Sequence, residues 1–365
     1  MLLRRVAALG AAACMVAAPK LWVSTGRLYP TVPALGWESL PYPFDYVLFG
    51  LALAALAGMA ASRRKLFPAA FLGLAAVLVA LDQSRLQPWL VQYAVMAGAA
   101  LVGAEAAATR VFFVGLYGFA GLHKLNLGFA VMLSEMLRPL AERWGAQGLL
   151  TAKVLTPAAV VAALWECGWG IGLVFARTRR VAAVCLMAQH VLLLLLLGPL
   201  GLNINRSVWA WNVTNIILLA VLFGKRERWD WQGMWRSHWY PPAVAAGVAA
   251  AGVLALIGWT DAYLGFGLYS GHTTTGALYV DPKRAPDLPE PVRKLVKADG
   301  VLDINLWSIQ ELGLPVYPET RIYLAVGRQV AVWLRYGDAV RVIEFSRRDR
   351  FTGQRQARTF DPLTQ

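Results

Sequence analysis

Long apolar stretches separated by short polar segments dominate the chain from its start to about residue 260. A stretch of about 20 apolar residues is long enough to cross the hydrocarbon core of a bilayer as a helix. The pattern predicts nine such spans. They cover residues 6–24, 44–62, 66–82, 88–107, 111–125, 154–176, 181–199, 207–224 and 241–260. Residues 127–150 instead place charged residues between apolar positions, which indicates an amphipathic segment lying on the outer membrane surface.

Short clusters of Lys and Arg fall at every second connection between the predicted spans. They lie at residues 4–5, 63–65, 110, 177–180 and 225–228. Basic residues concentrate on the cytoplasmic side of membrane proteins. The clusters therefore predict a cytoplasmic N-terminus and a C-terminal tail on the outer face, which is periplasmic at a bacterial inner membrane. An Arg pair before an apolar run also fits a signal peptide, but a first span accounts better for the alternation of the clusters.

The tail after residue 261 has the composition of an ordinary soluble domain. Three of its stretches alternate apolar and polar residues, which predicts strands of a small antiparallel sheet. They are residues 321–326, 329–336 and 340–345, with turn signals at Gly327 and at Gly337-Asp338. Residues 290–298 have apolar positions three or four apart, which predicts a short helix.

The domain organisation follows from this change of pattern. Residues 1–261 are predicted to form a polytopic all-α membrane domain, and residues 262–350 a small β-rich domain outside the membrane. Residues 351–365 are polar and basic, and we expect them to be disordered.

Composition supports a membrane protein and narrows the kinds of partner. The chain is 58% hydrophobic and 15% charged, whereas about a quarter of the residues of a soluble domain are charged. The net charge of +14 would suggest nucleic acid for a soluble protein, but here the basic clusters indicate topology, so membrane lipids and no nucleic acid are expected. The three cysteines form no CxxC motif, and the four histidines lack the spacing of a metal site.

Polar residues within or beside the predicted spans are few enough to name together. They are Asp82, Arg85, Gln92, Tyr93, Glu105, Arg110, His123, Lys124, Asn126, Glu166, His190, Asn203, Asn205, Arg206, Asn212 and Asn215. The predicted topology puts six of them toward the outer leaflet: Asp82, Arg85, Lys124, Asn203, Asn205 and Arg206. Glu166 and His190 are predicted nearer the middle of the membrane. A single cluster of these side chains is therefore geometrically possible.

Lys124 ends an otherwise apolar helix in which Gly115, Gly118 and Gly121 recur every three residues. A lysine at the centre of a bilayer costs roughly 2.5–3.5 kcal/mol, and such residues usually face the interior of a helix bundle. Desolvation disfavours the ammonium form, so Lys124 can serve as a base. The glycines would let a neighbouring helix pack closely enough to seal a pocket.

Each of these polar residues also has a purely structural interpretation. Lys124 could extend its ammonium group to the outer interface. Glu166 could pair with a cation, or it could be a protonated carboxyl bonded to a neighbouring helix. His190 could be a packed residue with satisfied hydrogen bonds, and Asn203 and Asn205 could cap the eighth predicted span.

The segment FAGLHKLNLGF, residues 119–129, resembles the horizontally transferred transmembrane (HTTM) family, which includes the vitamin K-dependent gamma-carboxylases. Lys124 matches the lysine that is the catalytic base of the carboxylase. Residues 82–93 are similar to the family segment before the fourth helix, and Glu166, Arg179 and His190 match polar positions of the later helices. The resemblance covers residues 40–225, and the tail resembles the outer-face β domain of bacterial relatives.

The resemblance implies that a reduced quinone is oxygenated with the lysine as the initiating base. The resulting oxide removes a glutamate γ proton, and the carbanion takes up carbon dioxide. This chain departs from the family at Trp89, which replaces a functional histidine and cannot transfer a proton. It also lacks the large lumenal region that holds protein substrates. A quinone or similar hydrophobic ligand near Lys124 is therefore expected, rather than peptide carboxylation.

The candidate site residues follow from the polar residues and the resemblance together. The candidate catalytic residues are Lys124, Glu166 and His190; the candidate substrate-binding residues are Trp89, Tyr93, Asn203, Asn205 and Arg206. The expected function is that of a membrane enzyme with Lys124 as base and a reduced quinone as the candidate cofactor. The alternative is a non-catalytic membrane protein that binds a lipid or a partner protein through its outer β domain.

Overall fold

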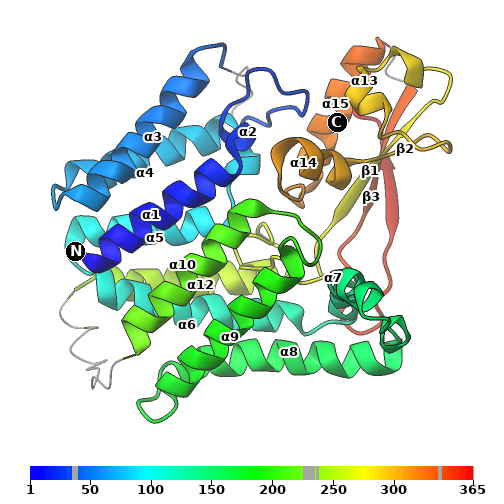
Figure 1. Ribbon diagram of the computed structural model, residues 1–365. Coiled ribbons are helices and arrows are strands. Elements are labelled where there is room, and N and C mark those ends of the chain that lie inside the picture. Colours follow the sequence, from blue (N-terminus) through cyan, green and yellow to red (C-terminus); the bar gives the residue numbers. More distant parts are fainter. Residues whose placement is uncertain (35–39, 225–234, 236–237, 336–338, 365) are drawn as a thin grey trace.

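The computed structural model describes residues 1–34, 40–224, 235, 238–335 and 339–364. Within these residues, a bundle of helices is followed by a small antiparallel sheet with its own helices (Figure 1). Four helices of the described part are long and apolar enough to cross a membrane, which indicates a multi-pass membrane protein. They are α3 (Phe44–Ala61), α8 (Ala152–Gly172), α9 (Arg179–Leu197) and α10 (Arg206–Phe223).

The remaining helices of the bundle are shorter or carry more charge. They are α1 (Leu2–Ala17), α2 (Pro19–Trp22), α4 (Leu66–Leu81), α5 (Pro88–Val102), α6 (Glu105–Lys124), α7 (Leu127–Arg143) and α12 (Tyr240–Leu256), with 3-10 turns η1 (Gln83–Arg85) and η2 (Gln147–Leu149). Helices α4, α5 and α12 are apolar but have only 16, 15 and 17 residues. Each of the predicted spans thus overlaps a helix, and four of these helices are both long and apolar enough to cross a membrane.

Several helix ends differ from the predicted ends for local reasons. The first predicted span is two helices, because the backbone leaves helical geometry at Ala18 and a new helix starts at Pro19. Helix α5 ends at Val102, five residues earlier than predicted. Gly103 follows it with φ of 80°, the left-handed conformation that glycine adopts after a helix. Helix α6 then begins at Glu105.

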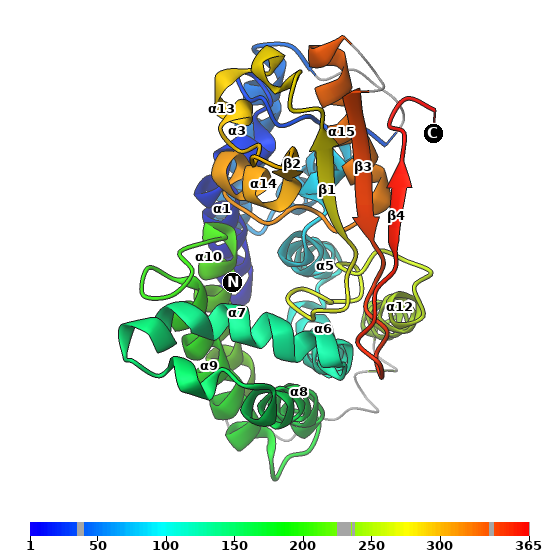
Figure 2. The same cartoon turned by 90° about the vertical axis from the view of Figure 1, so that its right-hand side faces the viewer.

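The two ends of the bundle carry different structures. Figure 1 shows the N-terminus and the α3–α4 and α8–α9 connections at one end, and the C-terminal sheet at the other. Helix α7 runs across the sheet end of the bundle (Figure 2). It buries Met136 and Leu140 and exposes Glu135, Arg138 and Glu142, so the prediction of an amphipathic helix in this stretch is confirmed.

The C-terminal part is a four-stranded antiparallel sheet in the order β2-β1-β3-β4. Its elements are β1 (Thr275–Val280), η3 (Ala285–Asp287), α13 (Glu290–Arg293), β2 (Val301–Asp303), α14 (Ile304–Leu312), α15 (Thr320–Leu334), β3 (Val340–Phe345) and β4 (Ala357–Phe360). Leu278 pairs with Leu302 on one side and with Val342 on the other, and all three side chains are buried. Helix α15 packs on this face of the sheet, and the ring of Tyr323 lies over Gly276.

Two of the three strands predicted in the tail were wrong. Residues 321–326 and 329–334 lie in helix α15, Arg335 follows its last residue, and Gly327 is inside that helix instead of in a turn. Its buried positions are Ile322, Tyr323, Val326, Gly327, Val330, Ala331 and Leu334, which follow a helical spacing. In two short windows the same residues also alternate, which misled the prediction. The predicted turn at Gly337-Asp338 lies outside the described residues.

The other predictions for the tail had mixed outcomes. Residues 340–345 form β3, as predicted. The short helix predicted at residues 290–298 ends at Arg293, and Val296 instead bridges to Leu302. The expectation of a disordered end was wrong for residues 357–360, which form β4 against β3.

An ion-pair cluster fastens the C-terminal part to the helix bundle. The Arg321 guanidinium pairs with Asp261, with 2.9 Å between Nη1 and Oδ1, and donates through Nε to Gln83 Oε1 at 2.6 Å. The Tyr317 hydroxyl also donates to Asp261 at 2.8 Å. Gln83 precedes α5 and Asp261 follows α12, so one arginine ties the sheet end to two separate parts of the membrane domain.

Helices α6 and α8 cross at glycines. A Cβ atom on Gly121 would lie 2.4 Å from the backbone nitrogen of Cys167, and one on Gly170 would lie 2.8 Å from the backbone nitrogen of Gly118. A Cβ atom on Gly118 itself would meet no atom within 4 Å. Close backbone approach through small residues is a common way for helices to pack in membranes. This crossing fixes Glu166, which precedes Cys167, relative to the end of α6.

Replacing Gly121 by Ala should therefore destabilise the protein. The added methyl group meets backbone atoms that cannot rotate away, and such overpacking costs about 1–3 kcal/mol, more than the ~0.5–1 kcal/mol that Ala gains over Gly in a helix. Thermal unfolding of the purified protein in detergent should show a lower midpoint for Gly121→Ala. The matched Gly118→Ala variant should unfold at or above the wild-type temperature. Equal midpoints for the two variants would contradict the close α6–α8 crossing.

Candidate functional site

A cavity of about 470 Å³ lies among α6, α7, α8, α9, α10 and the segment that follows α12. Most of its lining is aliphatic or aromatic, including Leu116, Met136, Leu193 and Phe266. Such a volume and lining are typical of a site for a small apolar molecule. The side chains of Val161, Trp165 and Leu192 line the cavity and are also exposed on the outside of α8 and α9, by 62, 42 and 51%. The cavity therefore reaches the surface at these two helices.

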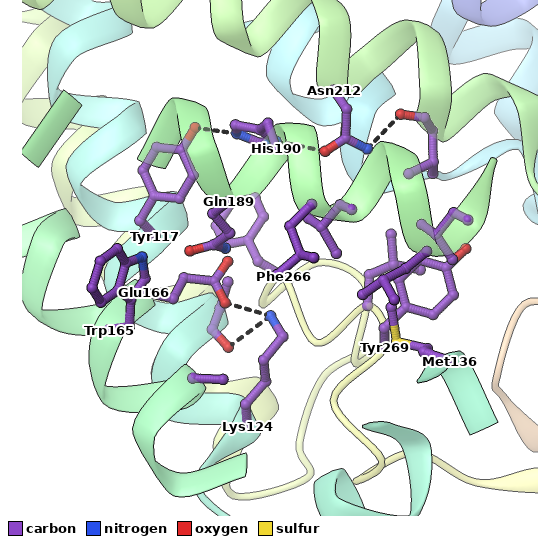
Figure 3. Close-up of a pocket in the computed structure, with 18 of the residues that line it drawn as sticks. Tyr117, Lys124, Met136, Trp165, Glu166, Gln189, His190, Asn212, Phe266 and Tyr269 are labelled. Carbon is purple, nitrogen blue, oxygen red and sulfur yellow. Dashed lines mark hydrogen bonds and ion pairs between the residues drawn. The ribbon is translucent and has the colours of Figure 1, made fainter. Parts of the chain in front are cut away.

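The first polar group on the cavity wall is an ion pair. Lys124 Nζ lies 2.7 Å from Glu166 Oε2, and the two side chains are only 14% and 8% exposed. The same ammonium group donates to the Ala120 carbonyl at 3.4 Å and lies 5.9 Å from the centre of the Phe129 ring. Figure 3 shows the lysine and glutamate side chains pointing toward each other from α6 and α8. The pair places one positive and one negative charge against an otherwise apolar space.

The second polar group is a row of three side chains. The Tyr117 hydroxyl lies 2.7 Å from His190 Nε2, and His190 Nδ1 lies 2.5 Å from Asn212 Oδ1 (Figure 3). The Asn212 amide donates through Nδ2 to the Val208 carbonyl at 2.7 Å, so its oxygen faces the histidine. Nδ1 of His190 must then carry the proton, and Nε2 accepts from Tyr117. His190 is thus a neutral imidazole at the middle of the row, with both ring nitrogens bonded.

Three of the predicted site residues meet at this cavity. Lys124, Glu166 and His190 come from α6, α8 and α9, and all three line it. Asn205 lies one step away, because its Nδ2 donates to the hydroxyl of Tyr269, a lining residue, at 2.9 Å. Asn205 precedes α10, but its side chain makes no capping bond to that helix.

The other four predicted residues lie away from the cavity lining. Trp89 is buried and packs edge-on against Trp22, with ring centres 5.8 Å apart. Tyr93 is also buried, with its hydroxyl 3.9 Å from Cys14 Sγ. Asn203 and Arg206 are exposed in the α9–α10 connection and at the start of α10. These four side chains do not contribute to the wall described above.

Sequence reasoning missed several lining residues. Tyr117 is seven residues before Lys124, two helical turns along the same face, and that spacing could have revealed it. Asn212 stood out as polar in an apolar span, but its bond to His190 depends on how α9 and α10 pack. Phe266 and Tyr269 come from the segment assigned to the outer domain, and no helical periodicity marks them.

The turn after Lys124 is held by the C-terminal part of the chain. The Asn126 side chain donates to the His123 carbonyl at 2.7 Å and to the Ser270 carbonyl at 3.0 Å. Its oxygen accepts from the Phe129 backbone at 3.0 Å and so caps α7. One asparagine therefore fixes the end of the lysine helix, the start of the next helix and the segment before the sheet.

Two glycines allow the close approach at this junction. A Cβ atom on Gly128 would lie 2.3 Å from the Gly271 carbonyl oxygen. Gly271 itself has φ of +69°, a conformation that other residues rarely adopt. The Leu127 backbone also donates to the Arg350 carbonyl at 3.3 Å. The position of Lys124 thus depends on residues more than a hundred positions later in the chain.

No family model, curated protein or solved structure matches this chain.

Breaking the Lys124–Glu166 pair should destabilise the protein more than replacing both residues. Removing one partner leaves a buried charge uncompensated, at a cost of about 3–5 kcal/mol, whereas an apolar replacement of both is often neutral. We expect Glu166→Leu to lower the thermal unfolding midpoint in detergent, and Lys124→Met/Glu166→Leu to restore most of it. A double variant as unstable as the single variant would show that the pair is not a coupled, buried unit.

Acid should weaken the junction through His272, which lies in the segment before β1. Burial, followed by the charge of Arg350, lowers the pKa of His272 from 6.5 to about 4. Between these values the unfolded chain binds a proton that the folded chain does not. The contribution of uncharged His272 to the free energy of unfolding is therefore present above pH 6.5 and is lost as the pH falls toward 4.

The comparison variant for this effect is His272→Asn. An asparagine can still donate to the Arg348 carbonyl, which His272 Nδ1 contacts at 2.7 Å, but it does not titrate. The unfolding midpoint of the wild type should fall relative to that of the variant as the pH is lowered from about 7 to about 4.5. Parallel pH profiles would mean that His272 is not shielded from protonation in the folded protein.

Proposed function

We propose that the chain is a membrane enzyme that acts on a lipid-soluble quinone or a similar hydrophobic substrate, with Lys124 as its base. The observation that carries the proposal is the Lys124–Glu166 ion pair on the wall of an apolar cavity of about 470 Å³. The apolar lining suits a hydrophobic ring and tail. The ion pair supplies an amine and a carboxylate to which a proton of such a molecule can be transferred.

The chemistry of the pair fits a base that becomes active on demand. At 2.7 Å, the Lys124 proton can pass to the Glu166 carboxylate, which leaves a neutral amine and a neutral carboxylic acid. The amine can then take a hydroxyl proton from a reduced quinone, and Glu166 holds the proton it received. Tyr117, fixed by His190, supplies a hydroxyl oriented beside the same space.

The route of entry fits a substrate dissolved in lipid. Val161, Trp165 and Leu192 line the cavity and form part of the outer surfaces of α8 and α9, two helices of membrane length. A lipid-soluble molecule could pass between these helices without crossing water.

We further propose about nine spans in a bacterial inner membrane. The basic residues of the α3–α4 and α8–α9 connections lie at the same end of the bundle as the N-terminus (Figure 1), which supports a cytoplasmic position for that end. The C-terminal sheet and α7 then face the periplasm. The five shorter or more charged helices of the proposed nine would need to tilt little or thin the bilayer locally.

The proposed substrate class agrees with the HTTM-like stretch around Lys124, and Trp89 limits the reaction. Trp89 has no proton to exchange and is packed against Trp22 outside the cavity lining. The expected chemistry is therefore deprotonation of a small hydrophobic molecule, without the transfer to a peptide that the carboxylases perform.

The alternative, a non-catalytic protein that binds a partner through its sheet domain, has less support. Phe266 and Tyr269, which follow α12 and lead into the sheet, form part of the cavity wall. The C-terminal part is thus tied to the cavity rather than presented as a separate module.

Removing the base without unfolding the protein tests the proposal. The substrate probe is decylubiquinol, the reduced form of a short-chain quinone. Once the base has removed a hydroxyl proton, the quinolate gives two electrons to dissolved oxygen, which leaves with the two protons as hydrogen peroxide, and the quinone formed is followed by absorbance. The Lys124→Met/Glu166→Leu variant should lose activity by about 100-fold or more, in line with the contribution of a general base. Lys153→Met, at an exposed lysine near the start of α8, should retain wild-type activity. Undiminished turnover by the double variant would refute the role of Lys124.

A further inference from the structure

Asn215 places an unused hydrogen-bond donor at the cavity. It lies on α10, its side chain is fully buried, and it lines the cavity. Its Nδ2 atom has no hydrogen-bond partner among the described residues. Asn212, one turn earlier on the same helix, has both ends of its amide bonded.

The orientation of the Asn215 amide is forced by its neighbours. Trp211 Nε1 lies 2.9 Å from Gln92 Oε1, and Gln92 Nε2 lies 2.8 Å from Asn215 Oδ1. An indole nitrogen can only donate, so Gln92 must turn its oxygen toward Trp211 and its amino group toward Asn215. Asn215 must then present its oxygen to Gln92. Rotating the amide would bring two amino groups face to face, so the unpaired group of this cavity-lining side chain is an N–H donor.

A donor left in this state is costly. A buried polar group without a hydrogen-bond partner costs about 1–3 kcal/mol of folding free energy, and folded proteins rarely leave such a group unpaired. The ordinary solution is a partner in the adjacent space. Here the adjacent space is the cavity, and the other polar groups that α10 contributes to its wall are already bonded, so the partner must bring its own acceptor oxygen.

We propose that Asn215 Nδ2 donates a hydrogen bond to a carbonyl oxygen of the hydrophobic molecule that occupies the cavity. This inference rests on the proposed function only in taking the cavity as the substrate site. It adds a requirement on the substrate, which must carry a carbonyl-type acceptor on an otherwise apolar body. It also separates two tasks: Asn215 holds the molecule through α10, and Lys124 with Glu166 acts on it from α6 and α8.

Binding of two probes tests the inference. Decylubiquinone has ring carbonyls, and decylbenzene has a similar tail but no oxygen. Equilibrium titration of each probe into purified protein gives its Kd. Asn215→Leu should weaken decylubiquinone by about 5- to 30-fold and leave decylbenzene unchanged or tighter. The control is Thr214→Val, a neighbouring polar residue that bonds to the Ala210 carbonyl and does not line the cavity; it should bind both probes as the wild type does.

The substitution leaves Gln92 without its acceptor, so a measurement on the intact side chain is needed as well. The infrared spectrum of decylubiquinone bound to the wild type should show a carbonyl band moved to lower frequency by the hydrogen bond. The same shift should persist in Lys124→Met/Glu166→Leu, which removes the lysine donor, and it should be lost in Asn215→Leu. An unshifted band, or equal affinity of the wild type and Asn215→Leu for decylubiquinone, would overturn the inference.

The two proposals fail in different ways. Loss of decylubiquinone affinity in Asn215→Leu, together with full turnover in Lys124→Met/Glu166→Leu, would retain the donor and remove the base. Loss of turnover in that double variant, with decylubiquinone affinity independent of Asn215, would support Lys124 as the base. It would also mean that the Asn215 amide bonds to water and not to the substrate.

Discussion

A buried lysine requires a partner, and the architecture around the cavity follows from meeting that requirement. Lys124 reaches Glu166 only because α6 and α8 approach within backbone contact at Gly121 and Gly170. Larger residues at the crossing would separate the two charges, and each would then bear its own cost of desolvation. The glycines thus determine an electrostatic interaction although they carry no charge, and the interaction in turn holds two helices that have little polar contact otherwise.

The C-terminal part belongs to the same arrangement. The Asn126 side chain and the Gly128–Gly271 contact fix the end of α6 against the segment that leads into the sheet. The Arg321–Asp261 pair fastens the other side of the sheet domain to the bundle. A change in the sheet domain could therefore reach Lys124 through a few backbone contacts, without any long pathway through the bundle.

Hydropathy predicted the helical class and the approximate place of the bundle helices, because a long apolar run has few other solutions in a bilayer. It also singled out Lys124, Glu166 and His190, since a polar residue in such a run is conspicuous. Sequence reasoning failed where the role of a residue depends on how the helices pack. Tyr117 and Asn212 acquire their relation to His190 only when three helices meet, and Tyr269 arrives from a segment without periodicity. Helix α15 was missed because Tyr323, Val330 and their neighbours fit both a strand pattern over six residues and a helix over fifteen.

The row formed by Tyr117, His190 and Asn212 limits how protons can leave the cavity. His190 Nδ1 donates its proton to a carboxamide oxygen, which is too weak a base to accept it. A proton that Tyr117 passed to Nε2 would find no onward acceptor and would create an imidazolium beside a phenolate. Stepwise conduction along this row is therefore blocked at Asn212, and His190 acts as a fixed acceptor that aims the tyrosine hydroxyl. Of the two polar groups on the cavity wall, the lysine–glutamate pair is therefore the one in which both partners can exchange a proton.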